Sequence, residues 1–248
     1  MSAIIVIPAR MASTRLPGKP LADIAGTPMI VRVWRQAMRA NAGPVLVAAA
    51  ETEIVEAIRK AGGEAVPTEP ELASGSDRVH QALKIFDADR RFDVVINLQG
   101  DLPALDPDAV TAVAEALNNS GASIATLAAP ISDPRDFDNP AVVKAIVAWD
   151  ASQARGRALY FTRARSPFGD GPLFHHVGIY AFTRDALERF IRLPVSPLEQ
   201  REKLEQLRAL EAGMHIEVAR IDEVPLSVDT PEDLERARTI LSGASTRN

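Results

Sequence analysis

The 248-residue sequence contains no cysteine. Disulfides, iron–sulfur clusters and thiol nucleophiles are therefore excluded, and the absence fits a reducing compartment. No stretch approaches the ~20 apolar residues that span a bilayer. The first residues also lack the charged and long apolar segments of a signal peptide. From these absences we expect a cytoplasmic protein.

An excess of positive charge is also missing. Lys and Arg number 28 against 33 Asp and Glu, so the formal net charge is −5. Bulk charge therefore predicts neither nucleic acid nor membrane as a partner. Hydrophobic residues make up 46% of the chain and charged residues 25%, as in a globular protein with a sizeable core. A local basic cluster on such a chain is better suited to a small anion.

Two familiar phosphate-binding loops are absent. In the Walker pattern the first glycine would fall at Ser13, and Pro20 takes the place of the Ser/Thr after Lys19. No G-x-G-x-x-G fingerprint of a dinucleotide site occurs either.

What is present is an alternation of short apolar strands with helical patterns. The helix expected from Met29 has Thr27 as N-cap and Pro28 at its first position, and Ser76 is the expected N-cap before Asp77. This rhythm predicts an α/β fold with a Rossmann-like, mostly parallel sheet and helices on both faces. The expected strands are 4–7, 45–49, 65–66, 94–98 and 123–127, and the expected helices are 29–40, 53–61, 77–86 and 108–117.

After Pro130 the rhythm changes. Strands are expected without helices between them, followed by two helices, a strand and a last helix from Pro231. We predict a single domain over 1–248, with an inserted antiparallel and helical lobe at about 131–220 and a frayed tail at 242–248. The expected strands are 142–149, 158–161, 177–182 and 216–219, and the expected helices are 185–191 and 198–211.

The segment from Pro8 to Gly26 follows the first strand and is far longer than the ~2–6 residues of an ordinary strand-to-helix loop. It lies where an open α/β sheet binds ligands, at the carboxyl end of a strand. Arg10, Arg15 and Lys19 occur within it, and no acid separates them. A solvated surface loop is the alternative, but length, position and a single sign of charge favour phosphate binding.

Two aspartates far apart in sequence suit a hard cation. Asp101 follows the strand 94–98, and Gly100 before it allows close approach of the backbone. Thr230 and Asp233 read as N-cap and capping acid of the last helix, which leaves Asp229 outside it. Mg²⁺ needs only one or two protein carboxylates beside substrate oxygens. A turn aspartate is the alternative for Asp101.

Sequence blocks along nearly the whole chain resemble one family, the 3-deoxy-D-manno-octulosonate (Kdo) cytidylyltransferases. The resemblance begins at the loop "IPARMASTRLPGKPL" and continues in the same order to "VDTPEDLERAR" near the end. The blocks between them are "SGSDRV", "NLQGDLP", "NPAVVK", "ALYFTRA", "HVGIYAF" and "SPLEQREKLEQLRALEAG".

The resemblance implies roles for particular residues. Metal binding falls to Asp101 and Asp229, which with Arg10 and Lys19 form the catalytic set. Nucleotide binding falls to Pro8, Ala9, Arg10, Arg15, Lys19, Ser74, Gly75 and Arg78. Binding of the sugar acid falls to Gln99, Arg163, His176, Tyr180, Glu205 and Gln206.

Individually, these sugar-side residues have ordinary structural interpretations. His176 could be a strand histidine with its hydrogen bonds satisfied, and Glu205 and Gln206 could belong to a solvated helix face. His176 and Tyr180 share one face of a strand, because they lie an even number of residues apart. Three positions depart from the family pattern: Leu102 stands where a Glu is usual, Leu72 where a His is frequent, and Ser76 where a Thr is frequent.

The implied reaction is CTP + Kdo → CMP-Kdo + pyrophosphate, with Mg²⁺ as cofactor and direct attack on the α-phosphorus. No covalent enzyme intermediate is expected, and no general base is assigned. The family also implies a homodimer and a product used in lipopolysaccharide biosynthesis. Two alternatives stay open: a cytidylyltransferase for a sialic acid or an amino-Kdo, and a non-catalytic nucleotide sensor.

Overall fold

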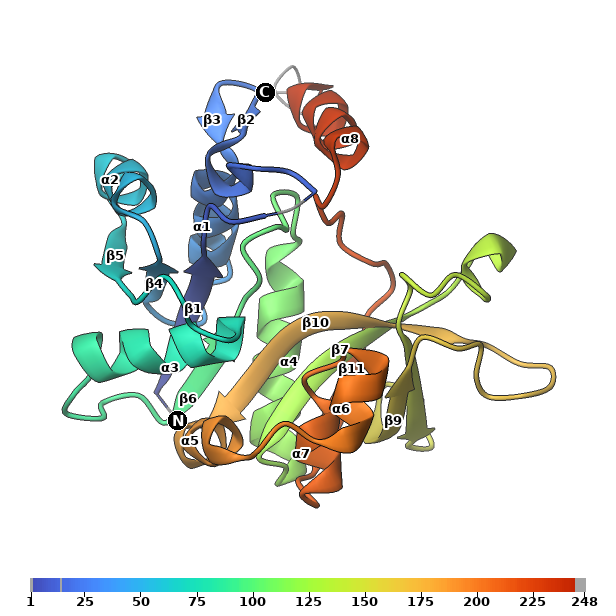
Figure 1. Ribbon diagram of the computed structural model, residues 1–248. Coiled ribbons are helices and arrows are strands. Elements are labelled where there is room, and N and C mark those ends of the chain that lie inside the picture. Colours follow the sequence, from blue (N-terminus) through green and yellow to red (C-terminus); the bar gives the residue numbers. More distant parts are fainter. Residues whose placement is uncertain (1, 14, 244–248) are drawn as a thin grey trace. The chain divides into compact units, whose positions relative to one another are not determined.

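The computed structural model describes residues 2–13 and 15–243 and divides into two compact units (Figure 1). Unit 1 consists of Met1–Val110 and Pro225–Asn248, and unit 2 consists of Thr111–Val224. The second unit begins inside helix α4 (Pro107–Ser120), earlier in the chain than the lobe expected at about 131–220. The prediction of one domain with an insertion stays a prediction.

A parallel sheet forms the centre of unit 1. Its strands lie in the order β5-β4-β1-β6, and every neighbouring pair is parallel. Residues Ile4 to Ile7 are fully buried. Such continuous apolar runs are typical of parallel strands covered on both faces. The strands are β1 (Ala3–Ala9), β4 (Val45–Ala49), β5 (Glu64–Pro67) and β6 (Val94–Asn97).

Three helices connect these strands: α1 (Met29–Arg39), α2 (Thr52–Lys60) and α3 (Gly75–Phe86). The chain moves across the sheet in one direction from β1 to β5 and then returns to β6. Because parallel crossovers are right-handed, α1 and α2 lie on one face and α3 on the other. The sheet of unit 1 is therefore covered on both faces.

A small substructure follows the first strand. It contains the 3₁₀ turn η1 (Lys19–Leu21) and the hairpin of β2 (Asp23–Ile24) and β3 (Thr27–Pro28). Thr27 was expected to cap α1, but it pairs with Ile24 across the hairpin and Pro28 occupies the N-cap position without a side-chain hydrogen bond. Pro28 of the hairpin therefore takes the N-cap position that was expected for Thr27.

Helix α8 (Pro231–Gly243) packs beside this hairpin, as Figure 1 shows. Ile24 and Met29 from the beginning of the chain share a buried cluster with Val228, Leu234 and Ala237 from its end. Apolar contacts thus hold α8 and Val228 against the β2–β3 hairpin and the start of α1. Of the tail expected at 242–248, Ser242 and Gly243 belong to α8 and 244–248 lie outside the described residues.

Unit 2 contains a mixed sheet in the order β10-β7-β11-β9-β8. β7 and β11 are parallel, and the other neighbours are antiparallel. β10 also pairs with β8 at His175 and Lys144, so this sheet curls back on itself. The strands are β7 (Ile124–Pro130), β8 (Lys144–Trp149), β9 (Arg155–Thr162), β10 (Phe174–Thr183) and β11 (Ile216–Arg220).

The single helix expected over 198–211 is wrong. The chain forms α6 (Pro197–Glu202) and α7 (Leu207–Glu211), and Lys203 between them adopts a left-handed backbone with φ 58°. The buried Arg208 guanidinium donates hydrogen bonds to both oxygens of Glu199, at 2.8 and 2.7 Å. This ion pair joins the two short helices and places Glu205 and Gln206 in the turn between them. The remaining elements are η2 (Pro134–Asp136) and α5 (Arg184–Arg192).

The predicted α/β class is confirmed, with a mixed arrangement of strands. Within the described part of the chain, none of the helices has the length and apolar character needed to span a membrane.

Candidate functional site

The candidate site of unit 1 lies at the carboxyl ends of β1 and β6. Val6 is in register with Asn97, and the Leu98 N–H donates to the Val6 carbonyl at 3.1 Å. The segments that follow the two strands therefore leave the sheet side by side. One carries Arg10 and the other carries Gln99 and Asp101.

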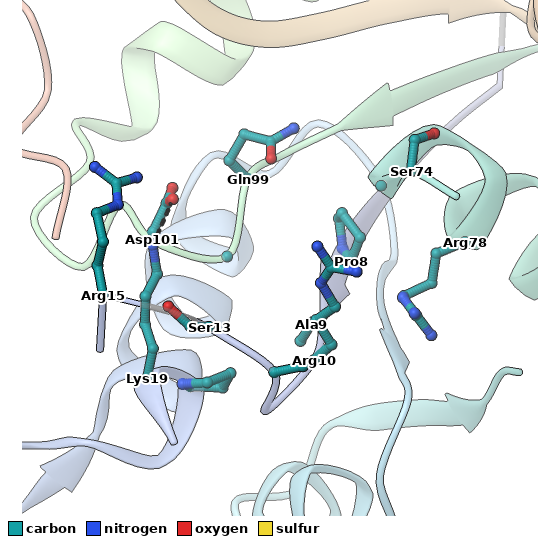
Figure 2. A pocket seen from close by; sticks show the side chains of 14 residues that line it. Pro8, Ala9, Arg10, Ser13, Arg15, Lys19, Ser74, Arg78, Gln99 and Asp101 are labelled. Atoms are coloured by element: carbon teal, nitrogen blue, oxygen red, sulfur yellow. Dashed lines mark hydrogen bonds and ion pairs between the residues drawn. The ribbon is translucent and has the colours of Figure 1, made fainter. Parts of the chain in front are cut away.

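These segments surround an open cavity of about 390 Å³ (Figure 2). Lys19, Asp101 and Arg15 lie at one end of the view, and Ser74 and Arg78 lie at the other. The lining residues are Pro8, Ala9, Arg10, Ala12, Ser13, Arg15, Lys19, Pro20, Ser74, Gly75, Arg78, Gln99, Gly100 and Asp101. The structure thus gathers every residue that the sequence assigned to the nucleotide, together with Gln99, which was assigned to the sugar side.

A backbone closure shapes the basic loop. The Gly18 N–H donates to the Met11 carbonyl at 3.3 Å, and Gly18 has φ 71°, a left-handed value that glycine adopts without strain. Pro20 is buried directly after Lys19. Fixed on both sides in this way, Lys19 projects into the cavity with only 15% of its side chain exposed.

Asp229 reaches the same place from the other end of the chain. The Val228 N–H donates to the Asp101 carbonyl at 2.9 Å. Thr230 and Asp233 form the predicted helix cap, because the Asp233 N–H donates to Thr230 Oγ1 at 3.2 Å and the Thr230 N–H donates to Asp233 Oδ2 at 3.0 Å. The Asp229 carboxylate is therefore not needed to cap α8.

A single ammonium group joins the two aspartates. Lys19 Nζ donates to Asp101 Oδ2 at 2.9 Å and to Asp229 Oδ1 at 3.0 Å, and Arg15 Nη2 lies 3.1 Å from the same Asp229 oxygen. Burial alone would lower the pKa of Lys19, but the charge of Asp101 and hydrogen bonds to both aspartates outweigh it and raise that pKa. Lys19 is therefore charged at neutral pH, and its charge lies between the aspartates.

The aspartate pair suits a hard cation. Asp101 and Asp229 already converge on one positive charge. No cluster of three or more potential ligands among His, Cys, Asp and Glu occurs within 2–13 and 15–243. Two carboxylates with substrate oxygens are the usual protein share of a Mg²⁺ shell, so these residues fit that ion.

The opposite wall of the cavity is organised by α3. The N-cap is Ser74 and not the expected Ser76, because Ser74 Oγ accepts the Asp77 N–H at 3.2 Å. Arg78 is 2% exposed and donates to the carbonyls of Glu69 and Pro70, at 2.9 and 3.1 Å. Burial lowers the pKa of Arg78, nearby Arg10 lowers it further, and Glu51 opposes them. Arg78 therefore anchors the segment before α3 and adds positive charge to this wall.

The predicted sugar-side residues, apart from Gln99, lie in unit 2. The rings of His176 and Tyr180 are 5.6 Å apart on one face of β10, as the spacing predicted. Glu205 acts on Tyr180 through its charge: burial first, and then this carboxylate, raise the pKa of the phenol. Gln206 is 6% exposed, and its Nε2 has no hydrogen-bond partner among the described residues.

His176 is neutral in this cluster. Burial, with a smaller effect of His175, lowers its pKa to about 3. Thr126 Oγ1 lies 2.9 Å from the Ile179 carbonyl and 3.0 Å from His176 Nε2. Thr126 Oγ1 also lies 3.2 Å from the Val177 carbonyl. Thr126 therefore ties the His176 ring to the backbone of β10.

Arg163 is held by backbone carbonyls. Its Nε donates to Glu202 at 2.7 Å and its Nη1 to Pro140 at 2.8 Å. It thereby fixes the carboxyl end of α6. Capture of a sugar carboxylate by Arg163 stays a prediction.

Sequence reasoning missed Thr126, which orients His176. The available signal was a lone hydroxyl residue in the buried strand around Ala125–Leu127. Leu102, which departs from the family pattern, is 6% exposed and therefore faces the interior.

The fold is of the α/β class, with a basic cavity at the carboxyl ends of two parallel strands, and comparison with known proteins identifies the family. The sequence model of the family described as "Cytidylyltransferase" matches residues 4–216. A 3-deoxy-manno-octulosonate cytidylyltransferase of Parvibaculum lavamentivorans is 61% identical, over 98% of this chain and 93% of that protein. One of Rhodospirillum rubrum is 60% identical, over 96% of this chain and 95% of that protein.

A solved structure agrees. CMP:2-keto-3-deoxy-manno-octonic acid synthetase in complex with CTP is 36% identical, with a TM-score of 0.90 over 98% of this chain and 100% of that chain. The chain therefore belongs to the cytidylyltransferase family and, within it, to the 3-deoxy-manno-octulosonate cytidylyltransferases. It is a nucleotidyltransferase.

Proposed function

We propose that this enzyme transfers the cytidylyl group of CTP to Kdo, which forms CMP-Kdo and releases pyrophosphate. The anomeric hydroxyl of Kdo attacks the α-phosphorus directly, and the bond from that phosphorus to the leaving pyrophosphate breaks. The observation that carries the proposal is the cavity of unit 1, where the basic loop, the start of α3 and Asp101 meet at the carboxyl edge of a parallel sheet.

The triphosphate is bound by the basic loop. Arg10 and Arg15 are exposed and Lys19 is half-buried, so three cations face a cavity that is open to a ligand. Catalysis then rests on positioning and on charge stabilisation, as in other phosphoryl-type transfers. Arg78 fixes the wall at which the cytidine binds.

Mg²⁺ is the proposed cofactor, and Asp101 and Asp229 are the residues that would hold it. When bound, the ion supplies charge neutralisation to the phosphates and a more acidic sugar hydroxyl. The protein's own part is to hold the two carboxylates close together. Lys19 and Arg15 do this at distances of 2.9 to 3.1 Å.

Kdo is bound by the polar cluster of unit 2. Gln206 Nε2 is a buried donor for which a ligand oxygen would be a suitable partner, because a buried donor without a partner is costly. Tyr180 stays protonated and His176 stays neutral, so both are suited to sugar hydroxyls.

The proposal is tested by pyrophosphate release from CTP and Mg²⁺ with Kdo, beside parallel reactions with N-acetylneuraminate and an amino-Kdo. We expect turnover with Kdo to exceed the others, and CTP to exceed ATP and GTP in kcat/KM. Faster turnover with another sugar acid would show that this sugar, and not Kdo, is the preferred substrate. Equal kcat/KM with a purine triphosphate would contradict the assignment of the base site.

We also propose that the enzyme is a cytoplasmic homodimer whose contact lies on the inserted lobe, and that its product enters lipopolysaccharide biosynthesis. The support for these points is the family alone. Light scattering coupled to size-exclusion chromatography gives the mass in solution, and a mass near the 26.7 kDa of one chain would contradict the dimer.

A further inference from the structure

Strand β4 ends at Ala49, and Ala50 and Glu51 follow it. Glu51 occupies the N-cap position of α2. The Glu51 side chain makes no capping hydrogen bond to its own helix, and Glu is not among the residues preferred at an N-cap. Instead Glu51 Oε2 accepts the Met11 N–H at 2.9 Å, across 40 residues of sequence. The side chain is therefore directed to the basic loop.

This contact completes a clamp on Met11. The Met11 N–H is held by Glu51, and the Met11 carbonyl is held by the Gly18 N–H at 3.3 Å. The peptide that Glu51 holds is the one that joins Arg10 to Met11. Because Ala9 is fixed in the sheet by the hydrogen bond from the Ala50 N–H at 3.0 Å, Arg10 is the residue between two fixed points.

We propose that Glu51 is a positioning residue for the nucleotide. It holds the Arg10–Met11 peptide in place so that Arg10 is presented to the triphosphate before the ligand arrives. This inference rests on the proposed function of the loop. It concerns how the loop is held, while the proposed function concerns what the loop binds.

The hydrogen bond and the negative charge of Glu51 have opposite effects on the affinity for CTP. As a hydrogen-bond acceptor it orders a loop that would otherwise lose conformational freedom on binding, and ordering before binding increases affinity. As an anion near a triphosphate it decreases affinity. A Glu51→Ala variant removes both effects, whereas Glu51→Gln keeps an acceptor oxygen and removes only the charge.

The experiment measures the Kd of CTP by calorimetry for the wild-type chain and for Glu51→Ala, Glu51→Gln and Glu53→Ala. Glu53 is an exposed acid in the first turn of the same helix and serves as the matched control. We expect Glu51→Ala to weaken CTP about tenfold, as for loss of one hydrogen bond to a charged group. Glu51→Gln should bind CTP at least as tightly as wild type, and Glu53→Ala should match wild type.

Two further measurements separate positioning from general destabilisation. Exchange of the Met11 amide hydrogen should accelerate in Glu51→Ala alone. In steady-state kinetics the KM for CTP should rise in Glu51→Ala, whereas the KM for Kdo stays unchanged.

The inference is overturned if Glu51→Ala binds CTP as well as wild type or more tightly. It is equally overturned if Glu51→Gln is as weak as Glu51→Ala, because the acceptor would then not matter. If the wild-type chain itself failed to bind CTP, the proposed function would fail with it. A failure confined to the variants concerns Glu51 only.

Discussion

The candidate sites of the two units differ in the charge of the groups that form them. The cavity of unit 1 is lined by formal charges on loops, and its Arg10 and Arg15 are exposed. The polar cluster of unit 2 contains three neutral groups beside the charged Arg163 and Glu205: His176 with a pKa of about 3, the protonated Tyr180 and the amide of Gln206. These side chains are held by a strand and by an ion-paired turn.

The proposed function gives a reason for this difference in charge between the two sites. A triphosphate carries several charges, so its site needs compensating charge, and exposed cations can supply it at a low cost of desolvation. The hydroxyl groups of Kdo need only fixed neutral donors and acceptors, and its single carboxylate is left to Arg163, whose role there stays a prediction. Substitutions in unit 1 should therefore reduce turnover and nucleotide binding. Substitutions in unit 2 should change the affinity for the sugar and the stability at acid pH.

The largest effect is expected from the aspartate pair. Asp101→Asn or Asp229→Asn removes one carboxylate from the cation site, and we expect kcat to fall by about 10³ or more. Turnover at saturating Mg²⁺, measured with far-UV circular dichroism as a check of folding, provides the test. Near wild-type turnover in both variants would show that the metal assignment is wrong.

Lys19→Ala comes next. The ammonium contributes charge to the cavity and joins both aspartates, so we expect kcat to fall by about 10²–10³. The KM for Kdo should change less, because the sugar-side residues other than Gln99 lie in the other unit. Lys19→Arg is the matched control for charge alone. Steady-state kinetics with a change confined to the KM for CTP would reduce the role of Lys19 to binding.

A smaller effect is expected at Gln206. Gln206→Leu keeps the bulk of a buried side chain but removes the donor without a partner. We expect the KM for Kdo to rise about tenfold while the KM for CTP stays constant. Unfolding of the free enzyme should be unchanged or shifted toward greater stability, because no hydrogen bond is lost. A rise in the KM for CTP instead would contradict the division of labour between the units.

The smallest effect concerns pH. The pKa of His176 is about 3 in the folded chain and near 6.5 in the unfolded chain. Between these values the unfolded chain binds one proton more, so the folded state loses stability as the pH falls from 6.5 toward 3. The contribution is at most about 1.4 kcal/mol per pH unit.

His176→Phe, which retains ring packing against Phe161 and Tyr180, should reduce this loss. Urea unfolding at pH 7 and pH 5 measures the difference. His215→Gln on the surface is the control, and an equal pH dependence in His176→Phe and wild type would refute the assignment.

Much of unit 1 could be predicted because its signals are local. Apolar runs such as Ile4–Ile7 indicate buried strands, and the predicted ranges agree closely with β1, β4 and β6. The site could also be predicted in outline, since parallel strands place the loops after β1 and β6 at one edge. The bond from Val228 to Asp101 could not be predicted from local pattern, because it depends on tertiary packing.

The failures share a physical cause. Lys203 is not a glycine, so nothing in "REKLEQL" marked the left-handed residue that ends α6. The break depends on the Arg208–Glu199 ion pair, which forms only after the two helices meet. In the same way, Thr27 does not cap α1, because its backbone pairs with Ile24 in the β2–β3 hairpin.

The division of unit 1 between the two ends of the chain has a consequence for biosynthesis. The contact of Lys19 with Asp229 joins residues 210 positions apart. A nascent chain synthesised as far as Val224 already contains the basic loop and Asp101, but it lacks Asp229. It also lacks Val228, Leu234 and Ala237, which bury Ile24 and Met29. The contact of Lys19 with both aspartates can therefore form only late, after nearly the whole chain has been synthesised and residue 229 has left the ribosome.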